Sequence, residues 1–194
     1  MEVAPRDDGR ESESRPAWRD PLDRPPPAVP PQGREVLFGV AHTRSRPAPK
    51  HAYAASALGE ALVPPFNASR GWHIAEQPEL RLGEHVLAAD LAAWRGERIA
   101  DLLTHALNFE VSPDWVGEVL ASSTTALDRG DKLTIYRTHG VSHVWLVDPE
   151  AKTLEVLQLD GPTYRIAAVF SGDAAVRAAP FDAIELDLSI LWAR

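Results

Sequence analysis

The chain has 194 residues, of which 44% are hydrophobic, which is enough for one compact domain with a core. Cysteine is absent, which excludes disulfides, thiolate catalysis and cysteine-based zinc sites, so any metal must be held by oxygen or imidazole. Lys and Arg total 20 and Asp and Glu total 28, so the formal net charge is 20 − 28 = −8, the wrong sign for a protein that coats nucleic acid. A protein that binds nucleic acid can confine its positive charge to the surface that makes the contact, so particular residues have to decide the function.

The sequence gives no reason to expect a membrane segment or an export signal. No run of about 18 apolar residues is present, and the N-terminus lacks the regions of a secretory signal. We therefore expect no membrane contact and a cytoplasmic location. Residues 1–33 mix charges with prolines and show almost no apolar periodicity. This composition predicts a disordered, partly polyproline tail ahead of one domain over residues 34–194.

The domain is expected to begin with a strand and a helix. Residues Glu35 to Ala41 read as the first strand. Residues His51 to Leu62 are rich in helix formers with apolar positions at helical spacing, which predicts a helix. Pro64 and Pro65 are expected to stop it.

Apolar segments in the middle of the chain predict further strands. Trp72 to Gln77 and Glu79 to Leu82 are short extended pieces, and Glu84 to Trp94 reads as a central strand with Asp90 in its middle. Trp115 to Ala121 is another short apolar strand, with Glu118 embedded in it.

The last third of the chain predicts a helix and then more strands. Thr125 and Asp128 approximate a capping box, and Gly140 suits the end of the helix that would follow. Extended segments are expected at Val141 to Val147, Thr153 to Leu159, Tyr164 to Phe170 and Ile184 to Leu191. The order of elements indicates an α/β or α+β domain with a mixed sheet.

Two carboxylates inside apolar strands are the first sign of chemistry. An ionised acid in such a strand is costly unless it is paired, hydrogen-bonded or bound to a metal, so Asp90 and Glu118 each need a partner. Hard cations such as Mg²⁺ take oxygen ligands, and one or two carboxylates with water and substrate phosphate suffice. Such a site suits phosphodiester hydrolysis, with a nearby ammonium to stabilise the developing negative charge.

The position of the ammonium departs from the simplest pattern. In an E-x-K strand the lysine stands two residues after the glutamate, on the same face. Here that position is Leu120, and the nearest candidate is Lys132 on the following helix.

From about residue 34 onward, the sequence resembles the Uma family of restriction endonucleases, bacterial proteins of the PD-(D/E)XK superfamily. The most specific match is the segment PDWVGEVLASSTTALDRGDKLTIYRTHGVSHVWLVDP, from Pro113 to Pro149. It resembles the family's order of proline-aspartate, an acid-bearing strand, a Ser/Thr-rich turn, a helix with aspartate, lysine and tyrosine, and an aromatic strand. A second match, PELRLGEHVLAADLAAWR from Pro78 to Arg95, resembles the glutamate-containing strand and the catalytic aspartate strand.

The resemblance implies a restriction-endonuclease-like mixed sheet flanked by helices, and a role for each site residue. Asp90 and Glu118 would bind Mg²⁺, for which Mn²⁺ would substitute, and Lys132 would be the superfamily lysine, supplied from the helix. Glu79 corresponds to a further acid and would join the site as an extra metal ligand or through water. The family has proline before the aspartate, where this chain has Ala89, which removes no chemical group. Such nucleases commonly work as dimers, so a homodimer is possible.

Structural roles compete with these functional ones. Asp128 and Lys132 stand four apart with the acid first, the order of an ordinary ion pair on a helix surface. Glu118 could be a buried acid that accepts hydrogen bonds from the backbone or pairs with an arginine, and Asp90 could be an acid at a strand end. We expect Asp114 to be a turn or cap residue. Tyr136 could touch a phosphate but is expected to serve packing, and His51 could approach a phosphate through its helix end but is expected to lie on a solvated face.

The function that these features indicate is that of a divalent-metal-dependent endonuclease hydrolysing DNA phosphodiester bonds, with Asp90, Glu118 and Lys132 at its centre. The alternative is a catalytically silent nuclease-fold module that binds nucleic acid or protein. A silent member is expected to have lost an acid or the lysine, and all three are present. RNA stays open as a substrate because the active-site chemistry would be the same.

Overall fold

The computed structural model describes residues 34–43, 47–67, 70–99, 109–122 and 124–192. The tail predicted over residues 1–33 therefore lies outside the described residues. Among the helices that are described, none has the length and apolar character needed to cross a membrane.

A six-stranded mixed sheet forms the centre of the domain, in the order β10-β9-β8-β7-β6-β3. Strands β7 (Trp115–Val119) and β8 (His143–Asp148) are parallel, and the other neighbouring pairs are antiparallel. The remaining strands are β3 (Trp72–Glu76), β6 (Leu91–Arg95), β9 (Thr153–Asp160) and β10 (Thr163–Ser171). The mixed α+β fold predicted from the sequence is confirmed.

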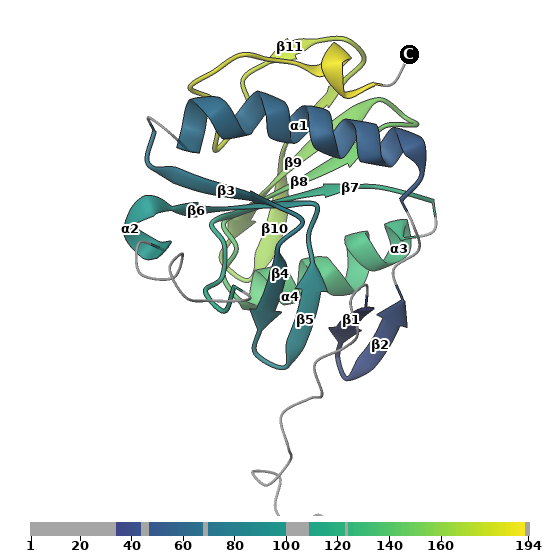
Figure 1. Ribbon diagram of the computed structural model, residues 1–194, viewed down its shortest axis with the longest axis vertical. Coiled ribbons are helices and arrows are strands. Elements are labelled where there is room, and N and C mark those ends of the chain that lie inside the picture. Colours follow the sequence, from purple (N-terminus) through teal and green to yellow (C-terminus); the bar gives the residue numbers. More distant parts are fainter. Residues whose placement is uncertain (1–33, 44–46, 68–69, 100–108, 123, 193–194) are drawn as a thin grey trace, which may run out of the picture.

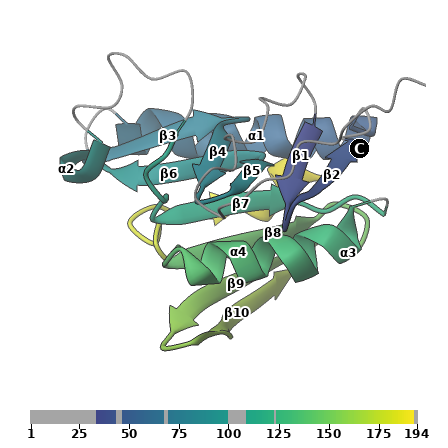
Figure 2. The same ribbon diagram turned by 90° about the horizontal axis from the view of Figure 1, so that it is seen from below.

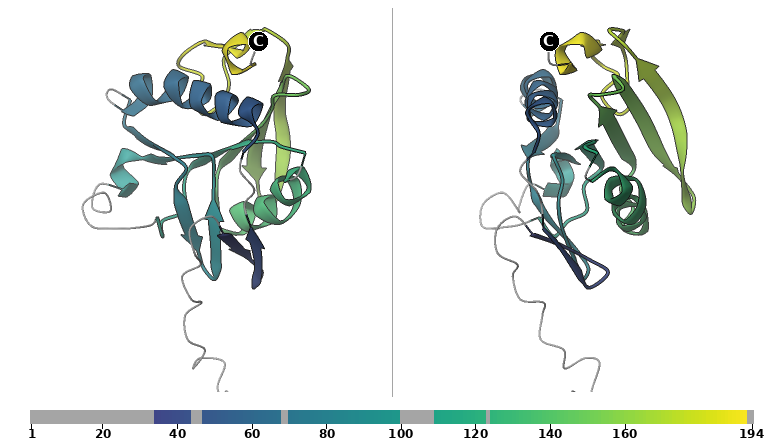
Figure 3. Two further views of the ribbon diagram at one scale, coloured as in Figure 1. Left: turned by 45° about the vertical axis from the view of Figure 1, so that its right-hand side comes forward. Right: turned by 90° about the vertical axis from the view of Figure 1, so that its right-hand side faces the viewer.

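Helices cover both faces of this sheet (Figures 1, 2 and 3). Helix α1 (Pro49–Asn67) lies on one face. A parallel pair of strands needs a crossover, and the connection from β7 to β8 forms one helix on the other face. Its three parts are α3 (Thr125–Leu127), the π-helical turn η2 (Asp128–Lys132) and α4 (Leu133–Thr138).

Two apolar clusters, one on each face, hold the helices to the sheet. The cluster under α1 includes the rings of Trp115, Trp145 and Phe181. The cluster under the crossover helix includes Trp94 and Leu146. A glycine motif ends the crossover helix: Gly140 has φ of +74°, and the next amide, Val141 N, donates to Tyr136 O at 3.0 Å.

A second, four-stranded sheet of order β2-β1-β5-β4 projects to one side of the domain, as Figure 1 shows. Its strands are β1 (Arg34–Leu37), β2 (Val40–Thr43), β4 (Glu79–Leu82) and β5 (His85–Ala88). The smaller elements are α2 (Gly96–Ile99), β11 (Ala175–Val176), β12 (Leu186–Asp187) and the 3₁₀ turn η3 (Leu188–Leu191).

The strand predicted from Glu84 to Trp94 is in fact two strands that belong to different sheets. Strand β5 ends at Ala88 and β6 begins at Leu91. Between them, Asp90 O accepts a hydrogen bond of 2.8 Å from Gln77 N, which is outside both ladders. Asp90 therefore lies at a break between the two sheets, where a side chain can face a cavity.

The first predicted strand also proved to be two. Phe38 and Gly39 have φ of +50° and +77°, which makes a tight hairpin turn between β1 and β2. The turn was missed because Phe is not a typical residue for this conformation.

The prediction that Pro64 and Pro65 stop the first helix was wrong. Helix α1 continues through them to Asn67, although each proline lacks an N–H donor. Tertiary contacts compensate: the Phe66 ring lies 4.7 Å from that of Phe181, and the Asn67 side chain exchanges two hydrogen bonds with the Ile74 backbone.

Two predictions near helix ends were also wrong. The capping box does not form, because Thr125 Oγ1 donates to Ala121 O at 2.7 Å and Asp128 contacts Lys132 instead. Most of the strand predicted from Ile184 to Leu191 is irregular or 3₁₀-helical, with only Leu186–Asp187 in a strand.

Candidate active site

Asp90 and Glu118 lie side by side because β6 and β7 pair antiparallel. Their register places Leu91 opposite Gly117, so one step further along both strands places Asp90 opposite Glu118. Both side chains are buried, with 4% and 2% of their surface exposed. Asp90 Oδ2 also accepts a hydrogen bond of 2.8 Å from Val119 N, which ties the first acid to the strand of the second.

Lys132 brings its ammonium to the same place from the π-helical turn η2. Its Nζ lies 3.3 Å from Glu118 Oε1 and 3.1 Å from Asp128 Oδ1. The side chain is 5% exposed. Asp128 and Lys132 are thus an ion pair, as their spacing allowed, but a buried one that faces the acids and not the helix surface.

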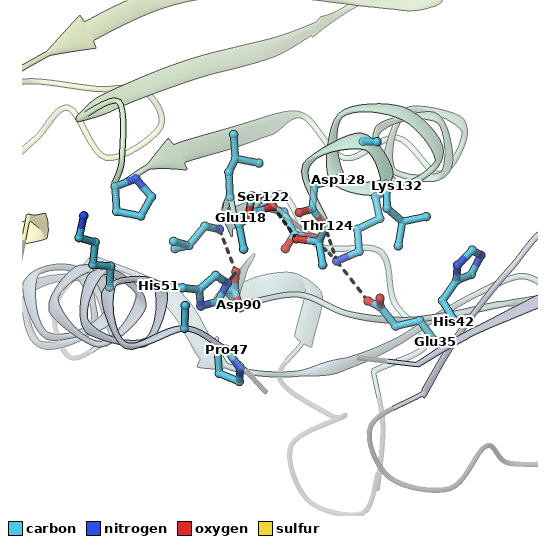
Figure 4. A pocket seen from close by; sticks show the side chains of 18 of the residues that line it. Glu35, His42, Pro47, His51, Asp90, Glu118, Ser122, Thr124, Asp128 and Lys132 are labelled. Atoms are coloured by element: carbon cyan, nitrogen blue, oxygen red, sulfur yellow. Dashed lines mark hydrogen bonds and ion pairs between the residues drawn. The ribbon is translucent and has the colours of Figure 1, made fainter. Parts of the chain in front are cut away.

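A third carboxylate approaches Lys132 from the small sheet. Glu35 Oε1, on β1, lies 3.1 Å from Lys132 Nζ and accepts a hydrogen bond of 3.0 Å from Ala88 N. Figure 4 shows Lys132 reaching from its helix toward Glu35, with Asp128 beside it. The ammonium is therefore held from three sides and has little freedom to move.

His51 contacts Asp90 from the first helix. Its Nε2 lies 3.2 Å from Asp90 Oδ2, and its side chain is only 11% exposed. Figure 4 shows the two side chains pointing toward one another. The expectation that His51 lies on a solvated helix face was wrong, because α1 begins at the mouth of this site.

Tyr136 contacts Glu118 from the same helix as Lys132. Its hydroxyl donates a hydrogen bond of 2.6 Å to Glu118 Oε1, and the residue is fully buried. Tyr136 does pack in the core, as predicted, but its polar end belongs to the site.

These contacts shift the pKa values of Asp90 and Glu118 in opposite directions. Burial, with the charges of Asp128 and Asp90, raises the pKa of Glu118 to about 8, against the opposite effects of Lys132 and Tyr136. Burial alone would raise the pKa of Asp90 too, but the hydrogen bonds from His51 and Val119 and the charge of Lys132 hold it below its ordinary value. Two neighbouring carboxyl groups with divergent pKa values are typical of active sites.

Lys132 keeps its proton throughout the physiological range. Burial opposes the charge, but the carboxylates of Glu118, Asp128 and Glu35 outweigh it and raise the pKa of Lys132 well above its ordinary value. Lys132 is therefore a fixed positive charge and not a general base.

A pocket of about 640 Å³ opens onto this group. Its walls are the N-terminal end of α1, strand β2, the segment after β7 and the crossover helix. Asp90, Glu118 and Lys132 all line it, so the three residues singled out in the sequence face a common cavity.

Glu79 lies outside the set of residues that line the pocket, so the geometry does not support its expected role as an extra metal ligand. It pairs with Ala88 across β4 and β5, and its side chain is 40% exposed and forms an ion pair of 3.2 Å with Arg81. It does not line the pocket, and the acid from the small sheet that does is Glu35. Asp114, expected at a turn, precedes β7 and accepts from Arg98 and the Arg95 amide, also outside the pocket.

Some of the missed residues left a signal in the sequence. Glu35 is a carboxylate in an apolar strand, the same criterion that identified Asp90 and Glu118. Tyr136 stands four residues after Lys132, so both lie on one helix face. The signal of His51 was only its place at the start of a predicted helix, and nothing in it pointed to Asp90, because only the tertiary fold brings α1 to that residue.

The donor set fits a hard divalent cation. Asp90 and Glu118 lie opposite one another across β6 and β7, so they are the acids that could bind one cation together, whereas Glu35 and Asp128 contact Lys132 from other elements. Both hydrogen-bonding contacts to Glu118 fall on Oε1, so Oε2 is the oxygen that a cation would meet. No group of three or more His, Asp or Glu side chains in the described ranges is arranged as a ready-made cation cage. Mg²⁺ does not require one, since it keeps several waters and uses one or two carboxylates with substrate phosphate.

Comparisons with known proteins bear on the family and the fold of the chain. The model of the Uma2 family, described as "Putative restriction endonuclease", matches residues 32–189. A crystal structure of a putative nuclease belonging to DUF820 from Anabaena variabilis ATCC 29413 superposes with a TM-score of 0.70 at 21% identity, covering 82% of this chain and 89% of that one. At this identity the likeness shows a shared fold. No curated protein matches the chain significantly.

Proposed function

Because the chain belongs to the Uma2 family, we propose that it is a divalent-metal-dependent endonuclease that hydrolyses phosphodiester bonds in DNA. The observation that carries the proposal is the convergence of Asp90, Glu118 and Lys132 on one pocket. The three residues come from a sheet junction, a strand and a helix, and nothing about the core requires two buried acids to face a cavity.

Asp90 and Glu118 are the residues proposed to hold Mg²⁺, for which Mn²⁺ would substitute. When bound, such a cation polarises a phosphoryl oxygen and makes water a better nucleophile at neutral pH. The lowered pKa of Asp90 keeps this carboxylate ionised at neutral pH. Tyr136 and Lys132 fix Oε1 of Glu118, and thereby orient its second oxygen.

Lys132 is proposed to orient the attacking water and to offset the negative charge that develops on the phosphoryl oxygens. In the reaction the water oxygen forms a bond to phosphorus and the water gives up a proton to solvent, while the bond from phosphorus to the leaving sugar oxygen breaks and the sugar oxygen takes up a proton. Glu35 and Asp128 keep the ammonium in one position, so no reorganisation is needed as the negative charge grows.

The test is cleavage of supercoiled plasmid and single-stranded DNA by the full chain with Mg²⁺ or Mn²⁺, and with EDTA. Asp90→Asn, Glu118→Gln and Lys132→Met are compared with Asp114→Asn, which changes an acid outside the pocket. We expect nicking that requires the cation, is lost in the three pocket variants and persists in the fourth. Absence of cleavage by folded wild-type protein on every substrate and cation would refute the proposal.

A further inference from the structure

An exposed ion pair closes one side of the pocket. Lys50 Nζ, at the start of α1, lies 2.7 Å from Glu150 Oε2, in the turn after β8. Both residues line the same pocket as the proposed catalytic group. Lys50 immediately precedes His51, which contacts Asp90, so this pair borders the proposed cation site.

The charges around the pocket do not by themselves favour a polyanion. The described residues that line it include two lysines and five acids, a formal balance of 2 − 5 = −3 with histidines neutral. The acids are Glu35, Asp90, Glu118, Asp128 and Glu150. One divalent cation would leave this balance negative, so binding of a nucleic acid strand depends on which lysine of the pocket is able to meet a phosphate.

The two lysines, Lys50 and Lys132, differ in whether they can contact a phosphate that flanks the scissile one. Lys132 is buried and surrounded by carboxylates, so it has no capacity for a second phosphate. Lys50 is 52% exposed and Glu150 is 73% exposed. Exposed pairs contribute little to stability, so the fold does not depend on this one and a phosphate could replace the carboxylate at small cost.

We propose that Lys50 binds a phosphodiester flanking the scissile one, and that the Glu150 carboxylate holds that place until nucleic acid displaces it. This inference rests on the proposed function, since it names a substrate contact of the same site. Glu150 then competes with the phosphate for Lys50, because binding of nucleic acid breaks the Lys50–Glu150 ion pair and forms an ion pair between Lys50 and the phosphate. Removal of Glu150 should tighten binding, and removal of Lys50 should weaken it.

The salt dependence of binding measures the contact directly. Each phosphate that a protein neutralises on B-DNA contributes about 0.9 to the slope of log K against log salt concentration. We would measure this slope for the full chain with a DNA duplex and with an RNA duplex of the same sequence. Ca²⁺ would replace Mg²⁺, and a gel would verify that the strands stay intact.

Lys50→Gln is expected to reduce the slope by about 0.9 on DNA, with the largest loss of affinity at low salt. Glu150→Gln is expected to raise affinity. Lys152→Gln is the matched control, because Lys152 is an exposed lysine of the turn that contains Glu150 and does not line the pocket. It should change neither the slope nor the affinity. Unchanged melting temperatures would verify that all three variants fold.

The outcomes separate this inference from the proposed function. An unchanged slope for Lys50→Gln on both nucleic acids overturns the inference, and plasmid cleavage by the wild type in the same preparation would leave the nuclease proposal standing. Binding without cleavage refutes the nuclease proposal while the slope still decides the role of Lys50. Neither binding nor cleavage by the wild type refutes both.

Discussion

The hydroxyl of Tyr136 donates a hydrogen bond of 2.6 Å to Oε1 of Glu118, the oxygen that Lys132 also contacts. Glu118 is therefore oriented by two donors from one helix, at positions four residues apart. The crossover helix thus supplies both the charge of the site and the support of its strand acid.

Tyr136→Phe should preserve the fold and lower cleavage by about 10- to 100-fold, the usual effect of removing a group that orients a metal ligand. The ring still fills the core, so only the donor is lost. The measurement is the rate of plasmid nicking at saturating Mg²⁺. Tyr164→Phe is the control, because its hydroxyl donates to Val141 O away from the pocket. Equal rates for Tyr136→Phe and the wild type would mean that the hydrogen bond is merely structural.

Removal of the buried ammonium should cost far more stability than removal of an exposed cation. Lys132→Ala leaves Glu35, Glu118 and Asp128 without their counter-charge, so we expect a loss of about 3–5 kcal/mol in the free energy of unfolding at neutral pH. Arg129→Ala breaks an ion pair with Glu155 nearer the surface and should cost about 0–1 kcal/mol. Urea denaturation of both variants makes the comparison, and similar losses would contradict the buried geometry.

Glu118 should contribute to the stability of the cation-free protein a term that falls as pH rises from about 4.5 to 8. The pKa of Glu118 is about 8 in the folded protein and 4.5 ordinarily, so between these values the folded state holds a proton that the unfolded state has released. A raised pKa gives stability that is present below the lower value and lost as pH passes the higher one.

Glu118→Gln cannot titrate, so its stability should decline less over the same range. The measurement is chemical denaturation in EDTA at several pH values. His85 and His143 have lowered pKa values and act in the opposite direction below pH 6.5, but they are common to both proteins. A constant difference between variant and wild type from pH 5 to 8 would show that the prediction is wrong.

Gly117→Ala should abolish cleavage, although it replaces none of the residues proposed for the site. A Cβ at Gly117 would lie 2.6 Å from Cη2 of Trp115, a ring that is held in the core against Trp145 and Phe181. Either the ring or strand β7 has to move, and β7 carries Glu118 in the next position. Gly130→Ala is the control, because nothing lies within 4 Å of its Cβ and alanine suits a helix. Retained nicking by a folded Gly117→Ala protein would contradict this coupling.

The sequence by itself determined the class of fold and the central residues. The order of apolar strands and helical segments indicated a mixed sheet, and Asp90 and Glu118 were identifiable because a carboxylate in an apolar strand demands a partner. The resemblance of the matched segments to the family then linked Lys132 with those acids. Each of these signals consists of residues that lie close together in the sequence, so each can be recognised without the tertiary structure.

Only the tertiary structure decided which acids meet and what surrounds them. Glu79 and Glu35 both belong to the small sheet, but pairing in that sheet turns Glu35 toward Lys132 and leaves Glu79 with Arg81. His51 reaches Asp90, and Lys50 reaches Glu150, across large separations in sequence. Such contacts depend on strand register and on how the helices pack against the sheet. Both are determined by the burial of side chains that lie far apart in the sequence, so no local sequence pattern predicts them.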